Sequence, residues 1–458
     1  MRQLLERCGR AAEPHPPGPP SGLLGLGPLL AYRKDPLGHV GRLAAEYGDV
    51  AFARVGRWPS FLLNHPDHVE QVMVRRRGAY RKDPFLQGLR PVIGDGLLTS
   101  EGEAWSGQRK LMAPAFTHTR VVRHAGTMVE CARAALAGWR DGEVRDVGAE
   151  MGRLSLEVAV RALFGTSCEA EARAVGEAFS VVSDHYGHSI GRLRLPRWVP
   201  TAGNRRVRRA EEELERVVAR IIAERRGAPG GEDLLSRLLA ARGDDGRGMG
   251  PKQLRDEVIT LLLAGHETTA LLLTYTWWLL GGAPGVLARL RDELDRVLGE
   301  RDPTPEDLPR LVWTQQLLWE SLRLYPPAAI LGRQAREADE IGGWKVPAGA
   351  LVFFAPWLLH RDPRFWEAPL ELRPERWTDG MRAALPRFAF FPFGGGERVC
   401  IGEAFALLEA RLVLATLARR VHFERVDDAG AGAAGLEVQP EITLRPVRPI
   451  RMRLVARR

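Results

Sequence analysis

Lysine is scarce in this 458-residue chain, and arginine carries nearly all of the positive charge. The formal net charge is +9, but the basic residues are interspersed with Asp and Glu and form no stripe with interleaved aromatic rings. Because nucleic-acid binding requires such a stripe, we expect no nucleic-acid partner. A basic surface that attracts an acidic protein stays compatible with this composition. The lysines are Lys34, Lys82, Lys110, Lys252 and Lys345.

Cysteine is equally rare, and the four cysteines lie far apart at Cys8, Cys131, Cys168 and Cys400. No two of them form a CxxC pair, which argues against a zinc knuckle and against a disulfide framework. This usage fits a reducing compartment, so we expect a cytoplasmic protein. Any chemistry performed by cysteine must therefore come from one residue acting individually.

Long uninterrupted hydrophobic runs are also missing. The amino end lacks the apolar core of a secretory signal, and we expect no membrane anchor. The longest apolar stretch, residues 258–280, has spanning length but carries Glu267 and other polar residues at its centre. A charged side chain at mid-bilayer costs about 2.5–3.5 kcal/mol, so the stretch predicts a buried core helix of a soluble protein.

Periodicity along the chain predicts a mainly α protein with small β-sheets at its edges. Residues 1–20 form a proline-rich lead that we expect to be extended and poorly packed, and residues 21–458 form a single domain. Strand patterns predict a pair within residues 50–64 that turns near Gly56, a strand at 350–355, and a final hairpin of 442–444 with 450–454. Helices are expected at residues 35–47, 66–76, 101–113, 122–139, 151–164, 169–185, 204–226, 233–242, 251–280, 284–298, 306–324 and 404–420.

The stretch from Phe393 to Gly402 carries the strongest chemical signal. Three consecutive glycines let the backbone turn tightly beside a flat object, because glycine has no side chain to collide with it. Cys400 then precedes a helix, whose amino end favours a thiolate. A cysteine in this position can serve as a nucleophile or a metal ligand. A small buried hydrophobe, the usual role of a lone cysteine, would need neither the glycines nor the arginine.

This stretch resembles the haem-ligand signature of the cytochrome P-450 superfamily, Phe-x-x-Gly-x-Arg-x-Cys-x-Gly. Phe393, Gly396, Arg398, Cys400 and Gly402 match its fixed positions. The resemblance implies a single-domain P-450 fold, with haem b (iron protoporphyrin IX) between the long central helix and the cysteine loop. It also implies that Cys400 ligates the iron, that Phe393 shields the sulfur, and that Arg398 reaches a haem propionate.

The polar residues in the long helix, from Ala264 to Thr269, resemble the oxygen-activation motif of the same family. By that resemblance Gly265 leaves room for dioxygen, while Thr268 and Glu267 are the catalytic residues that supply protons. His266 and Glu267 also begin like the zinc-protease motif His-Glu-x-x-His. Position 270 is Ala270, however, so the second metal ligand is missing. His266 is expected to be a residue on the helix face and not a ligand.

Three further residues match the structural network of the family. Glu320 and Arg323 are three apart on a helix, a spacing that by itself predicts only a surface ion pair. They resemble the family's Glu-x-x-Arg, and the stretch containing Arg376 resembles its Pro-Glu-Arg-Phe element, with Trp377 in place of Phe. The resemblance implies that Glu320, Arg323 and Arg376 form a buried charge network behind the haem.

Weaker matches concern the propionates and the substrate. Trp105 and Arg109 fit the family's Trp-x-x-x-Arg, and Arg333 is placed like its other propionate arginine, with a register uncertain by one residue. The resemblance implies an apolar pocket that selects its substrate by shape. Its expected lining is Phe85, Leu89, Val92, Leu263, Ala264, Ala328, Ile330 and the turn at residues 438–444.

The resemblance implies a monooxygenase that inserts one atom of O2 into a lipophilic small molecule. Terpenoids, fatty acids and polyketides all stay possible as substrates. Thiolate ligation suits O–O cleavage. Two alternatives stay open, namely a peroxide-using or non-redox haem-thiolate enzyme and a non-catalytic haem sensor.

Electrons are expected from a separate ferredoxin or flavodoxin with its NAD(P)H reductase, because the chain carries no fused redox domain. Such an acidic partner should dock on the cysteine side of the haem. The docking face should be bordered by residues 109–123, with Lys110, Arg120 and Arg123. We expect the enzyme to be a monomer.

Overall fold

The computed structural model describes residues 15–20, 26–167, 172–187, 196, 198–227, 230–231, 233–242, 246, 248–426, 431–432 and 435–457. The expectations that concern residues 1–14, residues 169–171, Cys8 and Cys168 lie outside these described residues.

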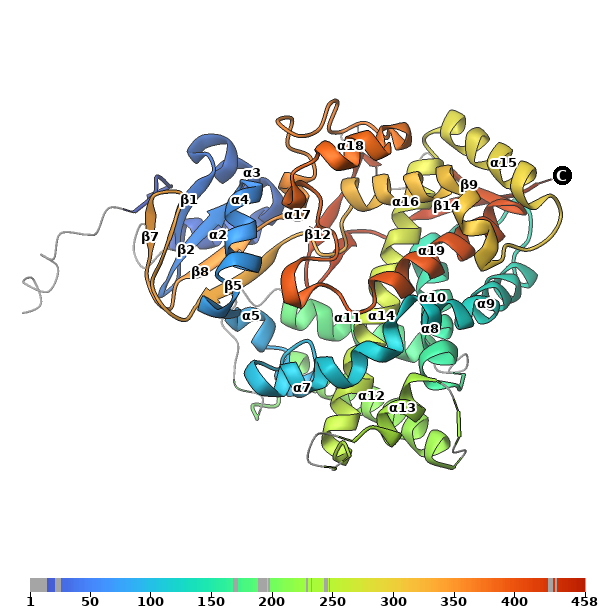
Figure 1. Cartoon of the computed structure of the whole chain (residues 1–458), viewed down its shortest axis with the longest axis horizontal. Coiled ribbons are helices and arrows are strands. Elements are labelled where there is room, and N and C mark those ends of the chain that lie inside the picture. The colour runs from blue at the N-terminus through green and yellow to red at the C-terminus, as the bar shows by residue number, and fades with distance from the viewer. Residues whose placement is uncertain are drawn as a thin grey trace, which may run out of the picture.

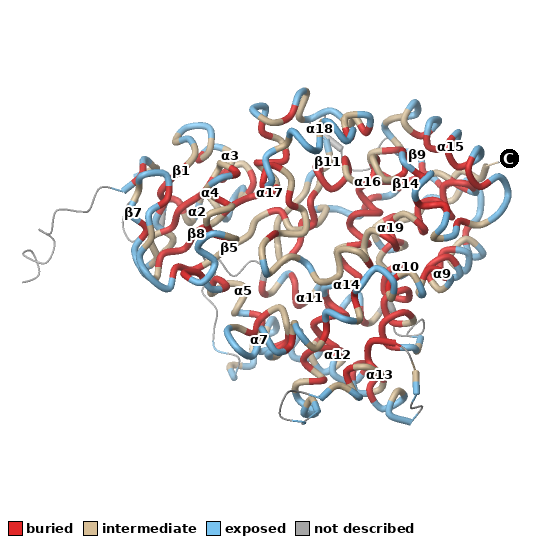
Figure 2. Tube along the Cα trace, in the orientation of Figure 1, coloured by how far each residue is buried: buried red, intermediate tan, exposed pale blue. Residues whose placement is uncertain are grey.

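A bundle of helices around α14 (Pro251–Leu280) forms the body of the protein (Figure 1). This 30-residue helix is buried along most of its length and packs against α10, α12, α16 and α19. The interior helices are buried, whereas α15 exposes one face and α18 is mostly exposed (Figure 2). The other helices are α2 (Leu26–Lys34), α3 (Pro36–Tyr47), α4 (Pro66–Glu70), α5 (Pro84–Gln87), α6 (Arg90–Ile93), α7 (Gly102–Met112), α8 (His118–Val121), α9 (Ala125–Ala137), α10 (Val147–Phe164), α11 (Ala172–Gly187), α12 (Ala202–Gly227), α13 (Leu234–Ala240), α15 (Pro284–Leu298), α16 (Val312–Leu324), α17 (Pro356–Leu359), α18 (Asp379–Ala384) and α19 (Glu403–Ala418).

Length and hydropathy single out α14, among the described helices, as long and apolar enough to cross a bilayer. Its most apolar window is 83% buried inside the protein, as expected for a core helix. The predicted class, mainly α with small sheets, is confirmed.

The largest sheet lies beside the helical body and joins distant parts of the chain (Figure 1). Its strand order is β1-β2-β8-β5-β3, and β2 pairs with β8 in parallel. The predicted strand pair is β1 with β2, which turn at Gly56 with a φ of 58°. The strands of this sheet are β1 (Val50–Val55), β2 (Trp58–Leu63), β3 (Tyr80–Lys82), β5 (Leu331–Ala335) and β8 (Leu351–Phe354).

The predicted final hairpin of residues 442–444 with 450–454 is wrong. β13 (Leu444–Pro446) pairs with β12 (Val438–Pro440), while β14 (Arg451–Ala456) joins β9 (Val421–Arg425) and β4 (Val144–Asp146). The two segments thus belong to different sheets, because β13 folds back on the neighbouring β12, whereas β14 finds a longer ladder with β9 and a second one with β4. The remaining strands are β6 (Asp339–Ile341), β7 (Trp344–Val346), β10 (Ala431–Gly432) and β11 (Gly435–Leu436).

The single helix predicted over residues 306–324 is divided in two. A 3-10 helix, Pro305–Arg310, is capped by reciprocal hydrogen bonds between Thr304 and Asp307. Leu311 then leaves helical geometry (φ −85°, ψ 57°), and α16 begins at the next residue. Pro309 inside the first turn has no N–H to donate, so it favours this break.

The proline-rich lead is better packed than predicted. Pro16 is buried, and the backbone N–H of Phe52 in β1 donates to the carbonyl of Pro17 at 2.9 Å. The ring of His15 stacks on that of Phe52 with centroids 4.3 Å apart. A free edge of β1 explains the difference, because an extended segment satisfies its unpaired backbone groups.

Candidate functional site

The cysteine loop folds tightly before α19. The N–H of Cys400 donates to the carbonyl of Phe393 at 2.9 Å. Gly394 and Gly396 have positive φ angles of 73° and 65°. A Cβ on Gly396 would lie 2.2 Å from the carbonyl oxygen of Met73, and one on Gly395 would lie 2.5 Å from the ring of Phe388. Close contacts with Met73 and Phe388 therefore require glycine at these two positions, in addition to the predicted approach of a flat group.

Cys400 faces open space inside the protein. Its side chain is exposed, yet burial among surrounding protein atoms raises the pKa of its thiol. The backbone N–H of Gly402, which caps α19, and the positive charge of Arg109 both act in the opposite direction. Protein atoms thus surround the sulfur without blocking access to it. The amino end of α19 and the positive charge of Arg109 both favour its thiolate form.

A short stretch of α14 also faces open space. Ala264 is exposed, and Gly265 and Thr268 are half-buried, although their helical neighbours are buried. A Cβ on Gly265 would meet only one atom within 4 Å, Leu163 Cδ1 at 3.9 Å, so packing does not require glycine there. The Thr268 hydroxyl donates to the carbonyl of Ala264 at 2.8 Å. These residues form the exposed part of a helix that is otherwise largely buried, and this exposed part is called the groove of α14 below.

Glu267 points away from that groove and is held by the last part of the chain. Its Oε1 accepts from Arg445 Nε at 2.5 Å and from the Thr443 hydroxyl at 3.0 Å. Sequence reasoning identified neither partner. A buried carboxylate in a core helix requires a cation, so the sequence indicated that Glu267 has a cationic partner. The residues around Glu267 did not indicate which arginine that partner is. The neighbouring His266 bonds to the Leu262 carbonyl at 2.6 Å and packs on Phe179, as a residue on the helix face would.

Cationic side chains cluster around Arg398 of the cysteine loop. Arg398 donates to both oxygens of Glu101 at 3.0 and 2.7 Å and lies 4.8 Å from the centre of the Trp105 ring. Burial and the charge of Arg398 lower the pKa of Arg333 to about 10. Burial and the same arginine lower the pKa of Lys82 to about 7. Lys82 and Glu101 were missed by sequence reasoning.

The balance of charge in this cluster fits a dianionic group. Arg398, Arg333 and Lys82 face Glu101 and Asp83, and burial raises the pKa of the Asp83 carboxyl. Cations therefore exceed firmly ionised carboxylates. Two further carboxylates, such as the propionates of haem, would relieve the repulsion among these cations. A thiol facing open space, a helix with a groove, and this cluster together form a donor set that fits haem.

Behind the cysteine loop the structure brings Glu320, Arg323 and Arg376 together. Arg323 donates to the two oxygens of Glu320 at 2.9 and 2.8 Å, and Arg376 donates to the same carboxylate at 3.1 Å. Glu320 and Arg323 are fully buried. The indole N–H of Trp377 adds a fourth bond at 2.9 Å. The residue that departs from the family's Pro-Glu-Arg-Phe thus strengthens the network.

The expected pocket residues are spread over several environments. Ala264 lies on the groove of α14, and Leu263, Leu89 and Val92 are buried in the main core. Ala328 is half-buried. Phe85 packs on Trp58 and Phe353 beside the large sheet. Ile330 lines a cavity of about 60 Å³ between α2, α3 and that sheet.

The basic face predicted for a partner borders α19. Arg120 and Arg123 line a hollow of about 250 Å³ together with His124, Asp233 and Arg237. Phe405 of α19 contributes to the same hollow, and α8 packs directly on α19. Within the described residues, no cluster of three or more His, Cys, Asp or Glu side chains could hold a metal ion.

Comparisons with known proteins agree with this geometry. The family model for Cytochrome P450 matches residues 16–430. Cyclooctatin synthase and cyclooctat-9-en-7-ol 5-monooxygenase of Streptomyces melanosporofaciens are 38% and 37% identical, over 88% and 86% of both chains. Pentalenene oxygenase of Streptomyces avermitilis is 33% identical over 92% of this chain and 93% of its own.

A solved structure extends the match to the fold. The heme domain of cytochrome P450DA superposes with a TM-score of 0.85 at 28% identity, covering 96% of this chain and 98% of that one. The resemblance inferred from the cysteine loop is therefore confirmed. The chain belongs to the cytochrome P450 family and is a monooxygenase whose cofactor is haem b.

Proposed function

We propose that this monooxygenase hydroxylates or epoxidises a polycyclic terpenoid, with haem held by Cys400 and electrons from a separate ferredoxin or flavodoxin. The observation that carries the proposal is the pair of open surfaces, the Cys400 sulfur and the Ala264–Thr268 groove. They belong to α14 and to the loop preceding α19, and these two helices pack together. When bound, the haem supplies the activation of dioxygen.

The chain's own residues orient the cofactor and supply protons. Arg398, Arg333 and Trp105 are proposed to hold the propionates, with Arg109 close to the sulfur. Thr268, whose hydroxyl already donates at 2.8 Å to its own helix, is proposed to deliver a proton at the groove. Glu267 is proposed to resupply that proton. Its ion pair with Arg445 must loosen for each transfer.

The substrate class follows from the lining and from the relatives. Ala264 and Ala328 present small apolar surfaces, and shape would therefore select the ligand. Three relatives are named for cyclooctatin, cyclooctat-9-en-7-ol and pentalenene, which are terpenoids. A terpenoid is thus favoured over the fatty acids and polyketides that the sequence also allowed.

Turnover with labelled oxygen tests the reaction. The protein, a bacterial ferredoxin with its reductase, NAD(P)H and 18O2 should convert a cyclic terpene to a product carrying one labelled oxygen. Thr268→Ala should bind the terpene as before but divert most electrons to hydrogen peroxide, because the proton donor is lost. Thr276→Ala is the matched control, since Thr276 makes the same bond to its own helix at 2.8 Å in the buried core. Equal coupling in both variants would contradict the role of Thr268.

Charge reversal tests the partner face. Arg120→Glu with Arg123→Glu should slow the first reduction by the ferredoxin and flatten its dependence on salt, because screening then has less attraction to remove. The substrate-induced absorption shift should not change. Arg205→Glu with Arg206→Glu, both exposed on α12, provides the control. Reduction that responds equally to both pairs would place the docking site elsewhere.

A further inference from the structure

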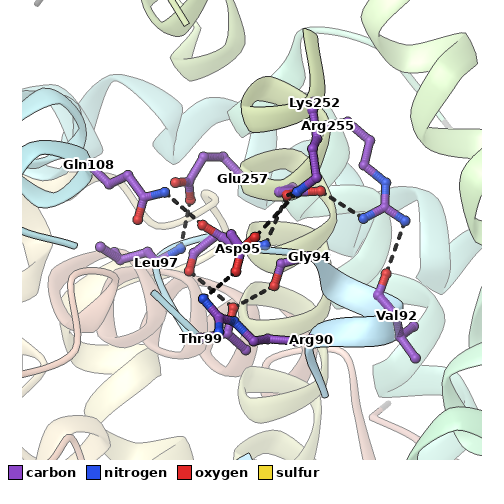
Figure 3. Close-up of polar contacts among 12 residues, drawn as sticks. Arg90, Val92, Gly94, Asp95, Leu97, Thr99, Gln108, Lys252, Arg255 and Glu257 are labelled. Atoms are coloured by element: carbon purple, nitrogen blue, oxygen red, sulfur yellow. Dashed lines mark hydrogen bonds and ion pairs between the residues drawn. The ribbon is translucent and has the colours of Figure 1, made fainter. Parts of the chain in front are cut away.

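Residues 94–100, here called the latch segment, connect α6 to α7 and lie along the amino-terminal half of α14 (Figure 3). Side chains from four other elements hold its backbone, and one of them is Gln87 of α5, which donates to the Thr99 carbonyl at 2.9 Å. Lys82 comes from β3, Gln108 from α7, and Asp256 and Glu257 from α14. A connection held in this way is a fixed wall and not a free loop, since most of its polar backbone groups have hydrogen-bond partners.

The side chains of two buried residues, Glu257 and Lys82, hydrogen-bond to the backbone N–H and C=O groups of Leu97. Its N–H donates to Glu257 Oε2 at 2.9 Å, and its carbonyl accepts from Lys82 Nζ at 2.9 Å. The same ammonium group donates to the carbonyl of Ser100 at 2.7 Å. Glu257 is fully buried and Lys82 is 6% exposed. A buried backbone N–H or C=O group is costly to leave without a partner, so these bonds fix where this peptide lies.

The rest of the segment follows α14 closely. Asp256 accepts from the N–H of Asp95 at 2.9 Å, and Gln108 donates to the Asp95 carbonyl at 2.7 Å. A Cβ on Gly96 would lie 2.3 Å from the Thr260 hydroxyl oxygen. Only glycine permits such an approach. The segment therefore cannot shift along α14 without losing these contacts.

This contact brings the segment to the edge of the groove. Thr260 lies one helical turn before Ala264, on the same face of α14. On the other side Lys82 belongs to the cation cluster, where Arg398 and Arg333 lower its pKa after burial. Leu97 and Leu98 are half-buried and pack against the main core. The segment thus runs between the cation cluster and the open face of α14.

Glu257 is unusual because its charge is only partly compensated. Its Oε1 has no hydrogen-bond partner among the described residues, and neither has the Thr260 hydroxyl. Burial, and after it the charge of Asp256, raise the pKa of Glu257 to about 7, while Leu97 N–H and Lys82 act against them. Burying such a carboxyl is costly, so its position requires a function that offsets the cost.

We propose that Lys82 and Glu257 are positioning residues that clamp the Leu97 peptide and so fix the latch segment as a wall of the substrate space. The clamp itself stands on the geometry, whereas its consequence for ligand size rests on the proposed function. With the clamp closed, Leu97 and Leu98 present a defined surface to large ligands. Without the bonds from either residue, the segment becomes more mobile, and large ligands lose that ordered contact surface.

Hydrogen exchange of the holoenzyme, followed by mass spectrometry, tests the clamp. Glu257→Leu removes the acceptor, and peptides covering residues 94–100 should exchange about tenfold faster or more, given about 1.5–3 kcal/mol for a hydrogen bond to a charged group. Glu257→Gln keeps an acceptor and should restore most of the protection. Glu409→Gln is the matched control, because Glu409 is equally buried, with a pKa raised to about 8 by burial, but lies on α19 away from the segment.

Lys82→Met provides an independent variant, since it removes the hydrogen bonds to the carbonyls of Leu97 and Ser100. The same faster exchange is expected for it, so the test holds if Glu257→Leu does not fold. Exchange unchanged in Lys82→Met and in any folded Glu257→Leu would overturn the clamp. Exchange raised equally in Glu409→Gln would overturn it as well, because the effect would then be general loosening.

Azole binding, measured by the haem absorption shift, tests the consequence. Clotrimazole is bulky and imidazole is small, and both bind iron through a ring nitrogen. Glu257→Leu should weaken clotrimazole binding about tenfold and change imidazole binding less than about twofold, because a preorganised wall favours only the ligand that touches it. Lys82→Met serves the hydrogen-exchange test alone, since Lys82 also belongs to the cation cluster proposed for the haem propionates. Unchanged clotrimazole affinity would overturn the positioning role. A parent protein that binds no azole would contradict the proposed function, while hydrogen exchange would still decide the clamp.

Discussion

Two buried charge networks, one around Glu320 and one at the latch segment, differ in how completely they are paired. Behind the cysteine loop, Glu320 accepts from Arg323, Arg376, the Trp377 indole and the N–H of Arg373. At the latch segment, Glu257 has a single bond from Leu97, and one of its oxygens has no partner in the described part of the chain.

This difference indicates different roles. A buried carboxylate with several donors rigidly connects the segments that supply those donors. A buried carboxyl with a pKa of about 7 changes its protonation near neutrality, so it holds its partner less firmly. We infer that the first network fixes the fold under the haem, and that the second holds a wall that ligands can influence.

Removing a charge from the paired network should have the largest effect. Glu320→Gln should destabilise the folded protein by about 3–5 kcal/mol, because Arg323 would stay buried without its counter-charge. The control is Arg216→Ala, which breaks an exposed i,i+3 pair with Glu213 and should cost less than about 1 kcal/mol. Denaturant unfolding measures both. Similar losses of unfolding free energy in the two variants would show that the buried ion pairs stabilise the protein no more than an exposed pair does.

Trp377→Phe should have an intermediate effect. It restores the family's usual residue and removes one donor from Glu320, which should cost about 1.5–3 kcal/mol. Trp366→Phe is the control, because its indole donates at 3.0 Å to a neutral carbonyl, that of Leu359. The same unfolding measurement should show a smaller loss for Trp366→Phe. The opposite order would mean that ring packing, and not the bond to Glu320, explains the tryptophan.

A third effect, spread over several pH units, is a pH dependence at the latch segment. Glu257 has a pKa of about 7 in the folded protein and an ordinary value of 4.5 when unfolded. The folded state therefore binds the extra proton between these values, and stability relative to Glu257→Gln should fall as pH rises from about 4.5 to about 7 and then level off. Stability relative to Glu409→Gln should fall up to about pH 8. A difference between wild type and Glu257→Gln that is flat with pH would contradict the partial compensation of Glu257.

The sequence was most informative where structure depends on local pattern. The apolar periodicity of α14, its polar centre, the cysteine loop and the Glu320–Arg323 spacing were all visible within short stretches. The break at Leu311 was missed because the helical pattern continues through it, while the cap at Thr304 and Pro309 decides the backbone.

Pairings across the chain could not be predicted from one sequence. Arg445 meets Glu267 although 178 positions separate them, and Lys82 and Glu257 meet only at the Leu97 peptide. The last strand, β14, likewise pairs with β4, which lies about 300 residues earlier in the chain. In each case a buried charge or a strand edge indicated that a partner is required, but not which one.

The identity of the iron ligand is the central claim, and one spectrum tests it most directly. The reduced carbon-monoxide complex of the wild-type protein should show the red-shifted Soret band of thiolate ligation. Cys400→His should keep some haem and lose that band, whereas Cys131→Ser should keep it, because Cys131 is buried and its pKa is raised by burial to about 12. An unshifted band in folded wild-type protein, or a shifted band that survives Cys400→His, would contradict the account.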